Sequence, residues 1–298
     1  MDITSFKVTD IEEVRADLPP RRRDAHKGNF GHVLSVCGSR DMPGAAVFAA
    51  RGAAECGAGL VTAAFPEAAY PAIASKLNEP IMLPLPGNPE GRLSFKGAEK
   101  LLAAAGRATA VLIGCGLGVD GDTIKITGAL IKNSCCPIIL DADGINIISK
   151  NINILREAAG ELILTPHPGE MSRLCGLSAE EINRDRVKTA LRFAAEWGVT
   201  LVLKGAGTVI AGARGECFVN STGNPGMARG GSGDVLAGMT AAFAAAGLPP
   251  ARACADAVYL HGAAGDLAAE TYSELGSTPT RLLDSLPGVF KKIGITER

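Results

Sequence analysis

The sequence predicts an α/β fold in which a central, mostly parallel sheet is flanked by helices on both faces as a three-layer sandwich. Short β-branched runs alternate with alanine-rich helical segments, and several runs are apolar throughout, as in strands that are buried on both faces. With 298 residues and 47% hydrophobic residues, the chain is long enough to bury one large core. We find no linker or internal repeat, so we expect a single domain over residues 1–298.

The predicted elements follow one another along the chain. Strands are expected at residues 32–37, 60–65, 110–113, 137–140, 161–164 and 200–203. The sequence pattern then changes: residues 207–219 contain the segments TVIAG, ARGE and CFVN. This pattern predicts an antiparallel hairpin over residues 207–219 with its turn near 213–215. Helices are expected over residues 235–246 and 250–270, where they close the core.

Composition excludes several classes of partner. The formal net charge is -1 and Arg21 to Arg23 is only a short solvated run, so we expect no nucleic acid and no membrane as partner. Residues 1–23 start without a signal-peptide pattern and read as a polar lead-in that Pro19-Pro20 ends. The eight cysteines form no CxxC pair and read as buried hydrophobes, so we expect a cytoplasmic protein without structural zinc.

Five polar or glycine-rich turns follow predicted strands. They read CGSRDMPGAA, GCGLGVDG, LDADGIN, TPHPGE and KGAGT. Parallel strands bring their carboxyl ends to one edge of a sheet, and ligands of open α/β sheets bind there. We therefore expect these turns to converge on one binding site for small molecules.

Residues 220–238, NSTGNPGMARGGSGDVLAG, are the most informative segment. A glycine-rich turn ahead of a helix aims unpaired N–H groups and the positive end of the helix dipole at one point, where a phosphate would sit. A carboxylate repels phosphate oxygens unless it takes a proton from a nucleophile or helps to hold a metal. Asp234 therefore indicates phosphoryl chemistry. The alternative is that Asp234 only caps the following helix.

Other polar residues in the turns have two interpretations each. His167, which prolines flank on both sides, either contacts a ligand or caps the helix that follows. Lys204 either meets a nucleotide or snorkels from a strand end. Of Asp141 and Asp143, we expect the first to face the site and the second to cap a helix. His261 is expected to be a core residue.

Competing motifs are weak or absent from the sequence. Gly116, Gly118 and Gly121 satisfy GxGxxG with Asp141 further on, which taken alone predicts a nicotinamide dehydrogenase. The helix after this motif is polar and starts late, and a lone GxGxxG is a weak signal, so we do not favour this interpretation. The sequence contains neither GxxxxGK[ST] nor GxSxG, which excludes a P-loop NTPase and a serine hydrolase.

The turns, in their order, resemble those of a known family. The segments that carry the resemblance are KGNFGHVLSVCGSRDMPGAA (27–46), GCGLG (114–118), LDADGIN (140–146), LTPHPGEMSRL (164–174), LKGAGTVI (203–210) and GNPGMARGGSGDVLAG (223–238). Together they look like the ADP/ATP-dependent NAD(P)H-hydrate dehydratases of the ribokinase-like superfamily. This family removes the added water from hydrated NADH and NADPH at the expense of a nucleotide. The resemblance implies a ribokinase-like fold, ADP cleaved to AMP and phosphate, and Mg²⁺ as cofactor.

The resemblance also implies roles for particular residues. The hydrated dinucleotide, as its S epimer, would contact Ala45, Gly116 or Gly118, His167 and Asp234, and Asp234 would be the catalytic base. Metal ligands are not evident. The adenine nucleotide and its phosphates would be held by Lys204, Gly205, Ala206, Gly207, Thr208, Gly231, Ser232 and Gly233.

The sequence departs from the family pattern at several positions. Members commonly read GPGLG where Cys115 stands, LDADALN around Gly144 and ATGGTGD around Arg229. The guanidinium of Arg229 either alters phosphate affinity or points to solvent. The family implies a homotetramer, and a separate NAD(P)H-hydrate epimerase because this chain has no room for a fused one. Two competing hypotheses are a small-molecule kinase for a hydroxymethyl vitamin precursor and a nucleotide sensor without turnover.

Overall fold

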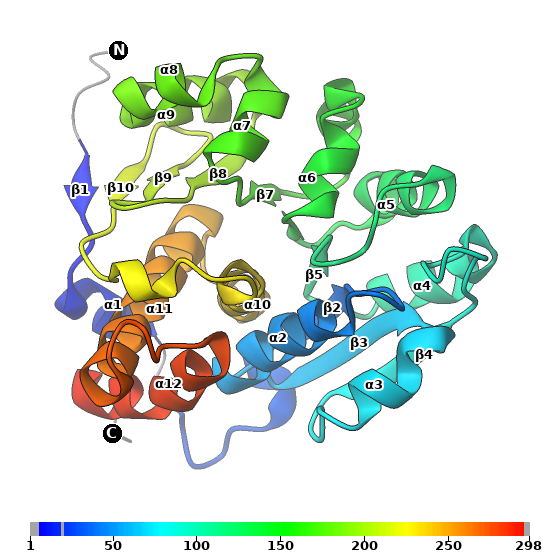
Figure 1. The fold of residues 1–298 in the computed structure, drawn as a ribbon, viewed down its shortest axis with the longest axis horizontal. Helices are drawn as coiled ribbons and strands as arrows, with labels where there is room; N and C mark the ends of the chain where they lie inside the picture. Colours follow the sequence, from blue (N-terminus) through cyan, green and yellow to red (C-terminus); the bar gives the residue numbers. More distant parts are fainter. Residues whose placement is uncertain (1–5, 19–20, 295–298) are drawn as a thin grey trace.

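The computed structural model describes residues 6–18 and 21–294, and within them one sheet crosses the whole molecule (Figure 1). Its strand order is β1-β10-β9-β8-β7-β6-β5-β2-β3-β4, and β9 alone among these strands runs antiparallel to its neighbours. The strands are β1 (Lys7–Val8), β2 (His32–Val36), β3 (Leu60–Pro66), β4 (Ile81–Leu85), β5 (Ala110–Ile113), β6 (Ile138–Leu140), β7 (Leu162–Leu164), β8 (Thr200–Leu203), β9 (Val209–Ala211) and β10 (Cys217–Val219).

Helices cover both faces of this sheet, which confirms the predicted three layers. One face carries α1 (Ile11–Asp17), α2 (Pro43–Glu55), α3 (Tyr70–Ala74), α10 (Ser232–Ala245), α11 (Pro250–Tyr272) and α12 (Pro279–Ile293). The other carries α4 (Ala98–Ala105), α5 (Gly121–Asn133), α6 (Asp143–Ile148), α7 (Pro168–Cys175), α8 (Ala179–Arg184) and α9 (Arg186–Trp197). Alternate residues of a strand serve the two cores, so Leu112 packs toward α10 and Val111 toward α5.

Most predicted elements are confirmed. The six predicted strands occur within one residue of their predicted ends, and β9 and β10 form the predicted hairpin. The predicted polar lead-in contains a strand and a helix that the sequence analysis did not predict: β1 pairs in parallel with β10, and α1 follows it. The stop assigned to Pro19-Pro20 lies outside the described residues. Helix α10 begins at Ser232, three residues before the predicted start at 235.

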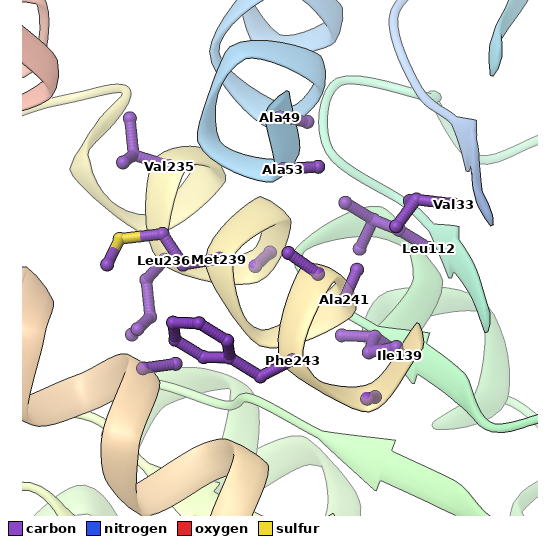
Figure 2. Close-up of a cluster of buried hydrophobic side chains, with 14 of the residues drawn as sticks. Val33, Ala49, Ala53, Leu112, Ile139, Val235, Leu236, Met239, Ala241 and Phe243 are labelled. Carbon is purple, nitrogen blue, oxygen red and sulfur yellow. The ribbon is translucent and has the colours of Figure 1, made fainter. Parts of the chain in front are cut away.

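Helices α2 and α10 pack with their backbones in close approach (Figure 2). A side-chain carbon at Gly238 would lie 2.1 Å from the carbonyl oxygen of Ala49, and one at Gly52 would lie 2.5 Å from that of Val235. Glycine is required at both positions because any larger residue pushes the helices apart. This contact fixes where α10 begins relative to the carboxyl ends of the central strands.

Candidate active site

A cavity of about 910 Å³ lies where the strands β6, β7 and β8 end and α10 begins. Because these strands are parallel neighbours, their carboxyl ends share one edge of the sheet, as the sequence predicts. Ten of the predicted site residues line this cavity: His167, Lys204, Gly205, Ala206, Gly207, Thr208, Gly231, Ser232, Gly233 and Asp234.

The start of α10 has the local geometry of the anion cradle that the glycines predict. Gly231 is the N-cap residue with φ 99°, and a side chain there would collide with the ring of Phe48. The carbonyl oxygen of Ser232 lies 3.0 Å from Nε2 of buried His261. Burial lowers the pKa of His261 to about 4, so this ring is neutral and donates to Ser232. The first amides of a helix have no intrahelical acceptor, so those of α10 are available to a phosphate.

Asp234 lies in the first turn of α10, and its side chain does not cap the helix. The capping alternative is therefore wrong, because the helix starts three residues earlier than predicted. Burial, followed by the charge of Asp141, raises the pKa of Asp234 to about 6, while Cys115 and Lys204 oppose this shift. A carboxylate with this pKa facing a cavity has the properties of a general base near neutral pH.

Lys204 follows β8 and its side chain is mostly buried, so the snorkelling alternative is wrong. Its Nζ donates to Oδ1 of Asp141 at 2.7 Å and lies 3.9 Å from Oε2 of Glu170. Burial alone would lower the pKa of Lys204, but the charges of Asp141 and Glu170 outweigh it and raise this pKa. Lys204 therefore presents a fixed positive charge at the wall of the cavity.

Glu170 is a site residue that the sequence reasoning missed. It is 5% exposed, and one of its oxygens accepts from the backbone of His167 at 2.8 Å. His167 in turn accepts through Nδ1 from the amides of Gly169 and Glu170, which completes a capping box at the start of α7. The capping interpretation of His167 is confirmed, and its position at the cavity leaves the predicted ligand contact as a prediction. The acid three residues after the cap is the signal in TPHPGE that predicts this arrangement.

A strained residue separates the two acids that follow β6. Ala142 has φ 48° and lines the cavity between Asp141 and Asp143. Asp141 is 1% exposed and accepts from Thr165 at 2.6 Å as well as from Lys204, so it is not available for a ribose as the dehydrogenase interpretation requires. The prediction that Asp143 caps α6 is wrong. Its carboxylate accepts from the amide of Gly118 at 2.8 Å instead.

Ala45, Gly116 and Gly118 do not line the main cavity within the described part of the chain. Ala45 and Gly116 lie together, because a side-chain carbon at Gly116 would come within 2.7 Å of Cβ of Ala45. Cys115, next to Gly116, donates its thiol proton to Oδ2 of Asp141 at 3.5 Å, and its sulfur lies within 4.8 Å of a carboxylate oxygen of Asp234. Ala45 and Gly116 therefore adjoin the acidic end of the cavity through Cys115, whereas Gly118 is connected to it through the hydrogen bond with Asp143.

Arg229 lies at the rim of the cavity and is exposed. Its guanidinium donates to the carbonyl oxygen of Leu275, on the loop that leads to α12. This contact occupies the guanidinium outside the anion cradle, which supports the second of the two interpretations of Arg229.

The fold and the glycine-rich start of α10 define a ribokinase-like protein, and solved structures of that superfamily confirm the predicted architecture. The sequence matches the model of the NAD(P)H-hydrate dehydratase family over residues 33–288. The ADP-dependent (S)-NAD(P)H-hydrate dehydratase of Bacillus subtilis is 37% identical over 283 residues, which are 94% of this chain and 96% of that protein. The chain therefore belongs to the NAD(P)H-hydrate dehydratase family.

Two further comparisons agree. The crystal structure of the ADP/ATP-dependent NAD(P)H-hydrate dehydratase from Bacillus subtilis, co-crystallised with ATP/Mg²⁺, aligns with a TM-score of 0.84 and 34% identity over 97% of this chain and 99% of that one. A bifunctional NAD(P)H-hydrate repair enzyme of Moorella thermoacetica is 43% identical over 94% of this chain and 53% of that protein. The chain thus spans about half the length of the bifunctional relatives it matches. Among the described residues, we find no helix that is long and apolar enough to span a membrane.

Proposed function

We propose that this chain dehydrates the S form of hydrated NADH and NADPH and couples the reaction to cleavage of ADP into AMP and phosphate. One observation carries the proposal: Asp234, with its raised pKa, faces a nucleotide-sized cavity at a helix start beside the cation of Lys204. Family membership supports the choice of substrate. A kinase for small alcohols uses similar chemistry, but no feature of the site favours it.

Asp234 performs the first proton transfer in this mechanism. It takes the proton of the ring hydroxyl, whose oxygen then attacks the terminal phosphorus of ADP, and the bond from that phosphorus to AMP breaks. The amides of Gly231 to Gly233 neutralise the charge that develops on the phosphoryl oxygens. The ring carbon–oxygen bond then breaks with push from the ring nitrogen, and phosphate leaves where hydroxide could not. Loss of a proton from the adjacent ring carbon to solvent then re-forms the ring double bond and completes the dehydration.

The binding residues divide into two groups in this proposal. Lys204 to Thr208, with Ser232 and Gly233, hold the nucleotide because they line the cavity around the anion cradle. His167, Ala45 and Gly116 or Gly118 hold the hydrated dinucleotide. The two groups meet at Asp234, whose carboxylate lies within 4.8 Å of the Cys115 thiol beside the second group.

The carboxylates of the site fit a magnesium ion that is held mainly by the nucleotide. Mg²⁺ takes oxygen ligands and uses one or two carboxylates together with phosphates and water. Asp141 and Asp234 offer such oxygens within 4.8 Å of one another, whereas the thiol of Cys115 does not suit this ion. When bound, Mg²⁺ would offset the charge of the phosphates.

Four further features belong to the same proposal. An NAD(P)H-hydrate epimerase supplies the usable stereoisomer, ADP is preferred to ATP, the chain assembles as a homotetramer, and the protein works in the cytoplasm. The first three follow from the family resemblance, and the last from the cysteine pattern of the sequence.

The experiment is a repair assay with hydrated NADH and either ADP or ATP. Recovery of the near-ultraviolet absorbance of NADH is expected, together with one phosphate per molecule repaired. Asp234→Asn is expected to lower kcat by about 10²- to 10⁴-fold because general-base catalysis contributes that much, while nucleotide binding persists. The control is Asp284→Asn, a change of the same kind at an exposed position on α12. No recovery with either nucleotide, or full turnover by Asp234→Asn, would refute the proposal.

A further inference from the structure

The loop over residues 220–228 forms one wall of the main cavity, and Asn220 and Met227 are among its lining residues. The loop follows β10, and the amide of Asn220 donates to the carbonyl oxygen of Thr208 at 2.9 Å. This hydrogen bond joins the loop to residues 204–208, which hold the nucleotide in the proposed function. The loop and that segment therefore form one continuous wall.

Helix α11 carries this loop on a row of small residues. A side-chain carbon at Gly262 would collide with Oγ1 of Thr222, and one at Gly265 would collide with Sδ of Met227. Residues three apart in a helix share one face, so Gly262 and Gly265 both turn toward the loop. The loop thus lies directly against the backbone of α11.

Asp266 adds polar contacts to this packing. It follows Gly265 on α11, and its Oδ2 accepts from the amide of Gly223 at 2.9 Å. Its Oδ1 accepts from Nδ2 of Asn224 at 2.8 Å, and Oδ1 of Asn224 accepts in turn from the amide of Gly226 at 3.0 Å. Within the described part of the chain, Asp266 does not itself line the main cavity, so it acts on a ligand only through the loop.

We infer that Asp266 is a positioning residue for the adenine nucleotide. The inference rests on the proposed function, in which the nucleotide occupies this part of the cavity. Hydrogen bonds to a carboxylate are stronger than those between neutral groups, so the two bonds of Asp266 keep the loop against α11. The apparent affinity for ADP is proportional to the fraction of molecules in which the loop has its binding shape. The residues that hold the hydrated dinucleotide lie outside this loop, so binding of that substrate does not depend on Asp266.

The test exchanges donor and acceptor between Asp266 and Asn224. Asp266→Asn leaves one acceptor for two donors, and Asn224→Asp sets two carboxylates against each other. The double variant, Asn224→Asp with Asp266→Asn, again places a donor opposite an acceptor. It also keeps an acceptor for each of the amides of Gly223 and Gly226 and leaves the net charge unchanged. Asp266→Ala removes both hydrogen bonds of the carboxylate.

Calorimetry measures the Kd for ADP on the full chain with Mg²⁺ and without hydrated NADH, so the result does not depend on turnover. Asp266→Ala should weaken ADP binding about 10- to 100-fold, since each hydrogen bond to a charged group contributes about a factor of ten or more to an equilibrium. Each single exchange should weaken binding about 10-fold. The double variant should return to within about threefold of the wild type.

A comparison of two constants separates positioning from a general loss of structure. In the repair assay, the KM for hydrated NADH should change by less than about twofold in every variant, as for a change away from a binding site. A merely structural role would raise this KM together with the Kd for ADP. Glu270→Ala, at an exposed position one turn further along α11, is the matched control and should leave both constants unchanged. Urea unfolding verifies that each variant folds.

Two results overturn the inference while the proposed function stands. One is a wild-type Kd for ADP in folded Asp266→Ala, and the other is a double variant that binds ADP no better than the single exchanges. If Asp266→Ala does not fold, the exchange series alone gives the decision. A wild-type protein that binds no ADP refutes the proposed function and the inference together.

Discussion

Replacing Gly238 by alanine tests whether the close contact between α2 and α10 positions the site. The new side-chain carbon would lie 2.1 Å from the carbonyl oxygen of Ala49 and 2.9 Å from the amide nitrogen of Ala53. Ordinary contacts of carbon are about 3.5 Å, so α10 must move by on the order of 1 Å. Both neighbours are backbone atoms of a helix and cannot rotate away.

The magnitude is the difference between two opposing effects. Overpacking of this kind costs about 1–3 kcal/mol, and a clash with backbone belongs at the upper end. Alanine returns about 1 kcal/mol because it is the better helix former. We therefore expect Gly238→Ala to lower the free energy of unfolding by about 2 kcal/mol. It should also lower kcat by up to about 100-fold, because a displacement of about 1 Å at catalytic groups has that effect and Asp234 lies one turn away.

Gly128→Ala is the matched control, since this glycine also lies inside a helix but a side chain there meets nothing within 4 Å. It should raise the free energy of unfolding by about 0.5–1 kcal/mol and leave kcat unchanged. Urea unfolding gives both values from the midpoint if the slope m is unaltered. If the two variants change stability in the same direction and to the same extent, the close contact does not control α10, and the reasoning fails.

Three shorter predictions concern charge. Burial raises the pKa of Asp256 to about 8. The native state therefore keeps a proton that the unfolded chain loses above about pH 4. The free energy of unfolding should fall by up to about 1.4 kcal/mol per pH unit between about pH 4 and pH 8. Urea unfolding of Asp256→Asn at pH 5 and pH 8 should show a smaller loss than the wild type. Lys204→Met removes a positive charge that lowers the pKa of Asp234. The acid limb of the pH profile of kcat/KM should therefore move to higher pH from about pH 6. An acid limb that does not move would mean that another group titrates there. Arg229→Ala should change the nucleotide KM by less than about twofold, the usual effect of about 0.5 kcal/mol at an exposed position, and a larger increase would place the guanidinium on the phosphates.

The central strands were predictable because they are apolar throughout, whereas the ends of the sheet were not. Strand β4 contains Pro84 and lies at one end of the strand order, where a missing N–H group is tolerated. Strand β1 has two residues and exists only through pairing with β10, a contact between distant parts of the sequence. Neither strand has a periodic pattern long enough to predict it.

The site shows the same division between local and distant information. The glycines and Asp234 were predicted as site residues because consecutive residues of the sequence indicate where a helix starts. The ion pair between Glu170 and Lys204 was missed because these residues are distant in the sequence. Only the packing of adjacent crossover connections brings them together. The hydrogen bond from the amide of Gly38 to the carbonyl oxygen of Cys115 is of the same kind, since the parallel pairing of β2 with β5 produces it.

The ion pairs of Lys204 have a consequence for affinity. Asp141 and Glu170 hold this side chain in place before any ligand arrives. Asp141 follows β6, Glu170 lies in the first turn of α7 after β7, and Lys204 follows β8, so the three residues come from consecutive crossovers of the parallel sheet. An immobilised lysine has little rotational freedom left to lose, and lost side-chain freedom typically costs about 0.5–1.5 kcal/mol on association. An incoming anion thus meets a rigid receptor whose ordering was completed when the sheet assembled.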